Sequence, residues 1–274
     1  MRTLALMAVT AWCAAAASGQ DKKDDAKELL KKALDVSQKA GGVTVSGSVS
    51  REDPFGGMGG QFGALMGEGI EGDFTATIGA NGITTVKVEN ENGVYELFQK
   101  GEKVVQRQTW TGQQIHAGAF AHEVTSILSL ARLGKHLDQA KDLKKGDTKK
   151  VGDVECVPVR GLFPAALAEE PGAEGPMNLK LQELKKIEAT IWIGREDHLV
   201  RSIEMKLTKG FSSAIRLPGG GDEDDDEGDE DEGGGQGFGM GKMKFVSTYR
   251  LTLKGYDKTT TVDVPAELKK FLND

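Results

Sequence analysis

Two runs of alternating apolar and polar residues meet at a short polar turn in the second half of the chain. The first run has the two-residue period of a strand with one buried face: Ile187, Ala189, Ile191 and Ile193. Residues 194–197 form the polar turn, and the alternation then resumes at Leu199, Ile203, Met205 and Leu207. Arg201 interrupts the second row, which predicts a partly wet face. We predict a hairpin here, with residues 245–255 as a third antiparallel strand.

The same period predicts further strands on both sides of this hairpin. Polar turns at residues 79–82 and 90–93 separate some of them, and the second turn contains Asn-Gly, a strong hairpin signal. The predicted strands cover residues 43–49, 70–78, 83–89, 94–99, 103–110, 151–160 and 259–264.

Helical spacing of apolar residues occurs in three segments. Residues 24–40 are amphipathic and stop at Gly41-Gly42; residues 123–143 are helical with a break predicted at Gly134; residues 265–272 start with proline. We therefore predict one α+β domain over residues 20–274, a curved antiparallel sheet with helical cover.

The start of the chain has the pattern of a secretory signal peptide. Arg2 is followed by an apolar run from Leu4 to Ala17, small residues end it, and charged residues begin at Asp21. We predict cleavage after about residue 19 and a periplasmic or extracellular protein. Trp12 precedes Cys13, which disfavours lipidation of that cysteine. Cys156 is then the sole thiol and is predicted to be a small buried hydrophobe.

Two segments have a composition unlike the rest. Residues 55–69 form a glycine-rich insertion, and residues 218–241 combine glycines with ten acidic residues between Asp222 and Glu232. We predict that residues 218–241 are a disordered loop. A calcium loop is the alternative, but its glycine falls one position late for an EF-hand. Without those ten charges, the net charge of −7 becomes +3, and no basic face for nucleic acid is evident.

Catalytic signatures are missing from the sequence. Residues 67–72 read G-x-G-x-x-G but lead into a strand instead of a helix, so we reject a dinucleotide site. No serine lies in a G-x-S-x-G elbow. The four histidines, which lack the spacing of metal ligands, are His116, His122, His136 and His198. The prediction is a protein that is not an enzyme and has no cofactor.

The apolar faces of separate strands are expected to meet on one side of the sheet. If side chains do not fill that side, it forms a pocket for a lipophilic ligand; if they do, it is only a core. The predicted lining of such a cavity is Phe74, Ile78, Ile191, Ile193, Met205, Tyr249 and Leu251.

Three short segments resemble the periplasmic lipoprotein-carrier superfamily, LolA and its LppX-like relatives. They are residues 43–49 (Val-Thr-Val-Ser-Gly-Ser-Val), residues 190–201 (Thr-Ile-Trp-Ile-Gly-Arg-Glu-Asp-His-Leu-Val-Arg), and residues 249–257 together with 262–265. The resemblance spans most of residues 24–272, although Gly194 stands where an acid is common and the two glycine-rich insertions are foreign to the pattern. It implies an unclosed β-barrel with helices as a lid over acyl chains.

The function expected from sequence is therefore non-catalytic binding or transport of a lipid or an acylated protein in the cell envelope. A lipid or lipoprotein is the expected partner, with transient membrane contact and no nucleic acid. The alternative is a structural or interaction protein of the envelope with a filled core and no ligand. The oligomeric state is left open.

Overall fold

The computed structural model describes residues 25–52, 72–90, 93–101, 103–108, 124–168, 182–211 and 244–273. The predicted signal peptide, the glycine-rich insertion and the acidic loop lie outside these residues, as do His116 and His122. No helix in the described part of the chain is long and apolar enough to cross a membrane.

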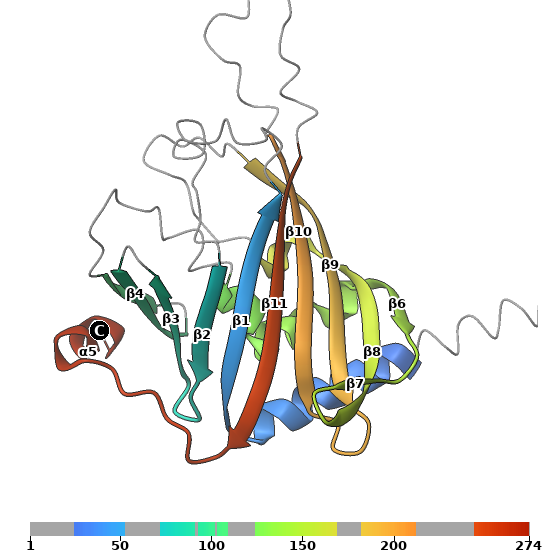
Figure 1. Ribbon diagram of the computed structural model, residues 1–274, viewed down its shortest axis with the longest axis horizontal. Helices are drawn as coiled ribbons and strands as arrows, with labels where there is room; N and C mark the ends of the chain where they lie inside the picture. Colours follow the sequence, from blue (N-terminus) through green and yellow to red (C-terminus); the bar gives the residue numbers. More distant parts are fainter. Residues whose placement is uncertain are drawn as a thin grey trace, which may run out of the picture.

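Within the described residues, one antiparallel sheet of eleven strands organises the fold (Figure 1). Its order is β5-β4-β3-β2-β1-β11-β10-β9-β8-β6, with β7 paired to β8, so β5 and β6 end an unclosed path. The strands are β1 (Gly42–Glu52), β2 (Gly72–Ile78), β3 (Ile83–Asn90), β4 (Gly93–Lys100), β5 (Lys103–Gln108), β6 (Lys141–Lys145), β7 (Lys149–Val151), β8 (Val154–Phe163), β9 (Gln182–Gly194), β10 (Val200–Phe211) and β11 (Lys244–Asp257). The predicted curved antiparallel half-barrel is confirmed.

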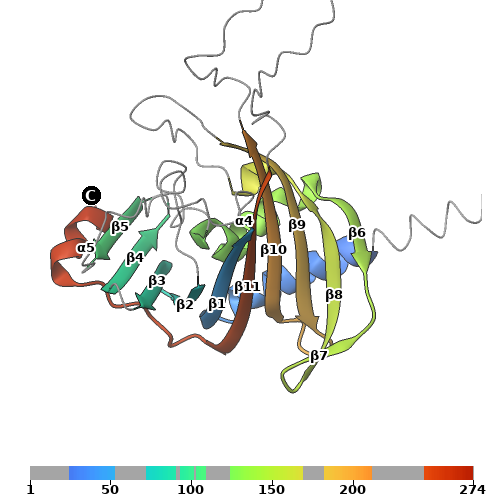
Figure 2. The ribbon, with the colours of Figure 1, turned by 45° about the horizontal axis from the view of Figure 1, so that its top comes forward.

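Helices cover one face of this sheet, which we call the inner face (Figure 2). They are helix 25–39, helix 124–128, α4 (Leu130–His136) and the 3-10 turn η1 (Leu137–Gln139). In helix 25–39, buried Ala26, Leu30 and Ala33 recur at helical spacing, so one stripe packs on the sheet. The helix ends before Gly41, whose φ of 106° and close approach to the backbone of Lys258 suit only glycine.

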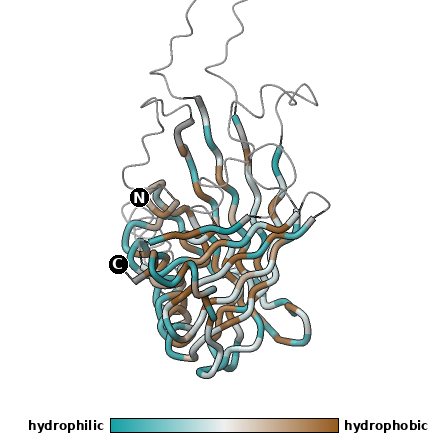
Figure 3. The backbone as a smooth tube through the Cα atoms, turned by 90° about the vertical axis from the view of Figure 1, so that its left-hand side faces the viewer, coloured by the Kyte–Doolittle hydropathy of each residue, from teal (hydrophilic) through white to brown (hydrophobic). Residues whose placement is uncertain are grey.

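Register places the apolar rows of neighbouring strands side by side on the inner face. Val45 lies opposite Leu253 and Ala76, Met205 lies opposite Tyr249 and Ala189, and each pair shares a face because antiparallel partners point the same way. Figure 3 shows hydrophobic and hydrophilic positions alternating along the strands. The inner rows and the helical stripes form one continuous core.

The central hairpin is confirmed, with one correction at its turn. Leu199 does not belong to the inner row: it lies outside the strand, and buried Val200 pairs with Ile193 instead. His198 adopts a left-handed φ of 57°, and the pairing shifts between Val200 and Ser202. Arg201 is the extra residue at that shift and forms an ion pair with Asp197, so it does not break the inner row.

The predicted helix 123–143 is wrong at its break and at its end. The break falls at Ser129, not Gly134, because the Ser129 hydroxyl accepts a hydrogen bond from the backbone N–H of Arg132 and caps α4. Helical structure ends at Gln139, and Leu143 lies in strand β6 with its side chain buried.

The predicted last strand, residues 259–264, is also wrong. This segment carries no ladder and crosses to the opposite, outer face of β3–β5, where the amide of Asn81 donates to the Val262 carbonyl at 3.0 Å. The predicted closing helix is confirmed as α5 (Ala266–Asn273). Together they cover a second small core on the outer face, formed by Phe98, Val262, Val264 and Leu272, with Ile83, Val105 and Leu268 against it.

Candidate functional site

All seven predicted lining residues lie on the inner face and belong to or contact the main core. Six are at most 4 % exposed, and Ile78 is partly buried against them. The structure thus brings together the residues that the alternation selected, from β2, β9, β10 and β11. Their role in binding a ligand stays a prediction.

A groove of about 460 Å³ reaches this inner face between the covering helices and the sheet. Its walls come from the end of helix 25–39, from residues 125–132 and from strands β1 to β4. The apolar part of its lining is Val43, Ile78, Leu128 and Leu130; the polar part includes Ser37, Thr84, Gln99 and Arg132. The volume lies within the range of small-molecule sites, about 300–1,000 Å³.

Two other hollows, of about 440 and 690 Å³, lie on the outer face. Charged and hydroxyl-bearing side chains dominate their walls, for example Asp73, Lys87 and Arg250 in the larger one. The groove on the inner face is the candidate site because its apolar side chains adjoin the main core. No local sequence motif predicts this groove, because its walls combine segments that are distant in sequence.

Helix 25–39 is tied to the sheet beside this groove by a buried hydroxyl. Ser37 is 1 % exposed, and its Oγ accepts a hydrogen bond from the Val200 N–H at 2.9 Å. The Tyr256 hydroxyl donates to the Val200 carbonyl at 2.7 Å. Burial raises the pKa of Tyr256 to about 12, against a smaller lowering by a hydrogen bond with Ser37. Ser37 therefore fixes one end of the helical cover to the start of β10.

Two basic residues, Arg51 and Lys209, occupy positions of the inner rows at the opposite end of the sheet. Arg51 continues the row of Val49 and pairs with Ser247, and Lys209 continues the row of Leu207. Burial and, to a smaller extent, the positive charge of Arg51 lower the pKa of Lys209 to about 8. Neither residue is among the site residues predicted from sequence, although a basic residue in the apolar phase of a strand is a recognisable signal.

Lys209→Met should stabilise the protein at about pH 7 by about 1–2 kcal/mol, because folding then no longer buries a protonated amine. The unfolded chain keeps that amine protonated up to about pH 10.4. Between about pH 8 and 10.4 the unfolded state binds more protons, so wild-type stability rises with pH and the variant's advantage shrinks. Urea denaturation across this range measures it, with Lys206→Met, exposed on the other face of β10, as matched control. An advantage independent of pH would contradict a buried amine.

Other chemistry-bearing residues fit structural roles. Cys156 is a fully buried free thiol, as predicted, and burial raises its pKa. Glu196 and Asp197 are exposed turn residues. Within the described ranges, no group of three or more His, Cys, Asp or Glu side chains could hold a metal ion.

The solved structures that are similar to this chain include two mycobacterial proteins. No family model matches the chain, and no curated protein matches it. The lipoprotein LppX of Mycobacterium tuberculosis has a TM-score of 0.47 at 14 % identity, covering 88 % of this chain and 99 % of LppX. LprF from Mycobacterium bovis has a TM-score of 0.44 at 13 % identity, covering 88 % of this chain and 96 % of LprF. Both TM-scores lie below 0.5.

Proposed function

We propose that this protein binds or carries a lipid, or the acyl chain of an acylated protein, without catalysing a reaction. The observation that carries the proposal is the groove of about 460 Å³ between the helical cover and the inner face. It leads from polar walls at Gln99 and Arg132 to the apolar side chains Val43 and Ile78, which are contiguous with the core. An amphiphile requires such a change from polar to apolar surroundings.

The layered fold suggests how such a site would admit a long chain. Helix 25–39 and α4 bury apolar stripes on the sheet, and their other sides carry exposed lysines such as Lys32 and Lys135. A shift of the helices away from the sheet would widen the groove toward Ile191, Met205 and Leu251 without breaking a strand ladder. In this proposal the seven residues predicted from sequence line the widened cavity, and ligand hydrocarbon replaces the helices as their apolar partner.

The proposal includes export to the cell envelope after removal of residues 1–19, with transient membrane contact during loading or unloading. Its support is the signal-peptide pattern at the start of the sequence. Mass spectrometry of native material should find a mature N-terminus between Ser18 and Asp21, without a lipid on Cys13. A diacylated cysteine would overturn both the processing and the localisation.

Ala131→Trp should lower the affinity for an environment-sensitive acyl probe at least about tenfold, equivalent to about 1.4 kcal/mol. Ala131 is exposed on α4 and lines the groove, so the indole would fill the groove with little harm to the core. Fluorescence titration measures the affinity. Lys32→Trp, on an exposed position of helix 25–39 away from the groove lining, is the control and should bind like the wild type.

Organic extraction of purified protein followed by mass spectrometry identifies any ligand that copurifies. If extracts contain no lipid and the wild type binds no probe, the carrier function is refuted. The structural alternative would then hold, and one observation favours it: six of the seven predicted lining residues are at most 4 % exposed, as in a filled core.

A further inference from the structure

The smaller hollow on the outer face, of about 440 Å³, lies over strands β8, β9 and β10. We call it the β9 hollow. Glu188, Thr190 and Trp192 line it from alternate positions of β9, so their side chains share one face of the sheet. Ile191, which lies between two of them, is fully buried on the other face. The β9 hollow is therefore separated from the candidate groove by the sheet itself.

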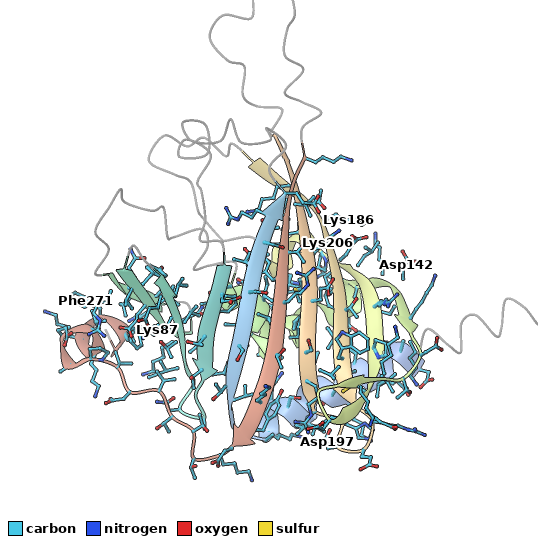
Figure 4. All side chains as sticks on the ribbon, viewed as in Figure 1. Lys87, Asp142, Lys186, Asp197, Lys206 and Phe271 are labelled. Atoms are coloured by element: carbon cyan, nitrogen blue, oxygen red, sulfur yellow. The ribbon has the colours of Figure 1, made fainter. Side chains whose placement is uncertain are left out.

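Strand pairing places charged side chains of both signs on either side of this row. Thr190 lies opposite Arg160 on β8 and opposite Glu204 on β10. Glu188 lies opposite Lys206 on β10, and Figure 4 shows Lys206 on the face of the sheet away from the helices. Neighbouring strands are about 5 Å apart, so the wall presents acceptors and charged donors to the same small volume.

Asp142 adds a third carboxylate to the wall from strand β6. It lies where the pairing between β6 and β8 shifts, and it adopts a left-handed φ of 53°, a conformation in which aspartate is enriched. Bulges of this kind re-aim a side chain, and Asp142 lines the β9 hollow from this position. The hollow is thus lined by three carboxylates and two cationic groups.

Two of these carboxylates are held by ion pairs with residues beside the hollow. Glu188 Oε1 lies 2.6 Å from Lys186 Nζ, and Glu204 Oε2 lies 3.7 Å from Arg250 Nε. A carboxylate has about four lone-pair sites, so each can also accept a hydrogen bond from a ligand. The ion pairs restrict both side chains before a ligand binds, which lowers the entropic cost of binding.

The mixed charge of the wall selects against charged ligands. An anion would lie beside the carboxylates, a cation would lie beside Arg160 and Lys206, and like charges at short distance are unfavourable. A hydroxyl group both donates and accepts hydrogen bonds. An uncharged ligand with several hydroxyl groups can therefore donate to the carboxylates and accept from the guanidinium or the ammonium, and all of these hydrogen bonds are charge-assisted.

Trp192 supplies the apolar part of the β9 hollow. Its side chain is partly buried, and an indole offers a flat apolar face together with one N–H donor. A sugar ring carries C–H groups on its faces and hydroxyl groups around its edge, which matches an aromatic face bordered by charged side chains. The larger outer hollow has hydroxyl and charged groups such as Ser46 and Lys87, but none of its described lining residues is a tryptophan.

We propose that the β9 hollow binds an uncharged oligosaccharide. One sugar ring packs on Trp192, and its hydroxyl groups form hydrogen bonds with Arg160 and Glu204. This site lies on the face of the sheet opposite to the candidate groove, so it does not rest on the proposed function.

NMR titration of the ¹⁵N-labelled protein with maltotetraose, cellotetraose and tetraacetylchitotetraose tests the inference. At least one of these uncharged sugars should shift the indole N–H signal of Trp192 in a saturable way, and Trp192→Phe assigns that signal by its loss. Sorbitol, which has hydroxyl groups but no ring, should give no saturable shift. Raising the ionic strength from about 0.05 to 0.5 M should change the affinity less than about twofold, because salt does not screen an uncharged ligand.

Three variants remove the proposed contacts one at a time. Trp192→Ala should lower the affinity for the bound tetrasaccharide at least about tenfold, because the apolar face is lost. Arg160→Gln and Glu204→Gln should each lower it about tenfold, because each removes a hydrogen bond to a charged group. Backbone amide signals of β9 report binding in all three variants, and melting temperatures establish that they fold.

Matched controls make the same changes at exposed positions outside the hollow. Phe271→Ala removes an aromatic ring that is 55 % exposed on α5, and Arg195→Gln and Glu196→Gln remove one charge of each sign from the turn after β9. All three controls should bind the tetrasaccharide like the wild type.

The inference is overturned if no uncharged tetrasaccharide gives a saturable shift, if sorbitol gives the same shift, or if the controls lose as much affinity as the variants. Tighter binding of tetragalacturonate, an anionic sugar, would likewise contradict an uncharged ligand. The acyl probe is titrated in parallel. A protein that binds the probe but no sugar keeps the carrier function and loses the sugar site, and a protein that binds only the sugar gives the reverse result.

Discussion

Gly47→Val is expected to destabilise the protein by about 2–3 kcal/mol, near the upper end for overpacked cores. Gly47 lies opposite Phe74 on the inner face, and the Phe74 ring lies across it. A Cβ at this position would be 2.2 Å from Phe74 Cζ. Phe74 is 4 % exposed, so moving its ring would disturb the packing around it. Urea denaturation monitored by circular dichroism measures the loss.

Two further variants separate steric conflict from a general effect of replacing glycine. Phe74→Ala in the Gly47→Val background should recover part of the lost stability, because removing the Phe74 ring also removes the steric clash. Gly134→Ala should be neutral or stabilising by up to about 1 kcal/mol, since α4 is helical there and the nearest atom to a new Cβ is Gln38 Nε2 at 3.9 Å. If the Gly47→Val protein is as stable as the wild type, the packing of the Phe74 ring does not require a glycine at position 47.

Ser37→Ala is expected to cost about 1–3 kcal/mol, because the buried Val200 N–H loses its acceptor. It should also speed uptake of the acyl probe, since the end of helix 25–39 beside the groove is held less tightly. Stopped-flow fluorescence measures uptake, and denaturation measures stability. Ser46→Ala, exposed on the outer face of β1, is the control and should change stability by less than about 0.5 kcal/mol.

Tyr256→Phe tests whether Ser37 and Tyr256 act together on Val200. Each single change removes one hydrogen bond from the same backbone unit, so the double variant should lose less than the sum of the two single losses. If the losses of stability in the two single variants add up to the loss in the double variant, the two hydrogen bonds act independently. Slower probe uptake in Ser37→Ala would contradict the view that this tie holds the cover closed.

The strands could be predicted from the sequence because their period has one physical cause, an apolar inner face beneath helices. Predictions from apolar spacing were wrong where a segment buries its apolar residues in another way. The predicted helix runs on to Leu143, but Leu143 fills an inward position of β6. Val262 and Val264 alternate with polar residues like a strand, yet they pack on the outer face without a ladder. Apolar spacing records which side chains are buried and does not record the hydrogen-bond partner of the backbone.

The candidate site was less accessible to sequence reasoning than the fold. The inner rows named Phe74, Ile191 and Met205 correctly as neighbours on one face. The groove depends on how residues 125–132 sit over the turn after β2, and no local pattern reports such a tertiary arrangement. Arg51 and Lys209 could have been noticed as basic residues in the apolar phase, but only pairing through β11 shows that they share one end of the face.

The C-terminal segment has a consequence for association between copies of the chain. It shields the outer side of Phe98 and Val105 on β4 and β5, and β5 ends the strand path. Without that cover, an apolar strip would adjoin the unpaired backbone groups of an edge strand, the combination that templates strand addition and aggregation. Cover by residues 258–273 therefore buries the apolar strip beside β5, and loss of this cover is expected to favour strand addition by a second molecule.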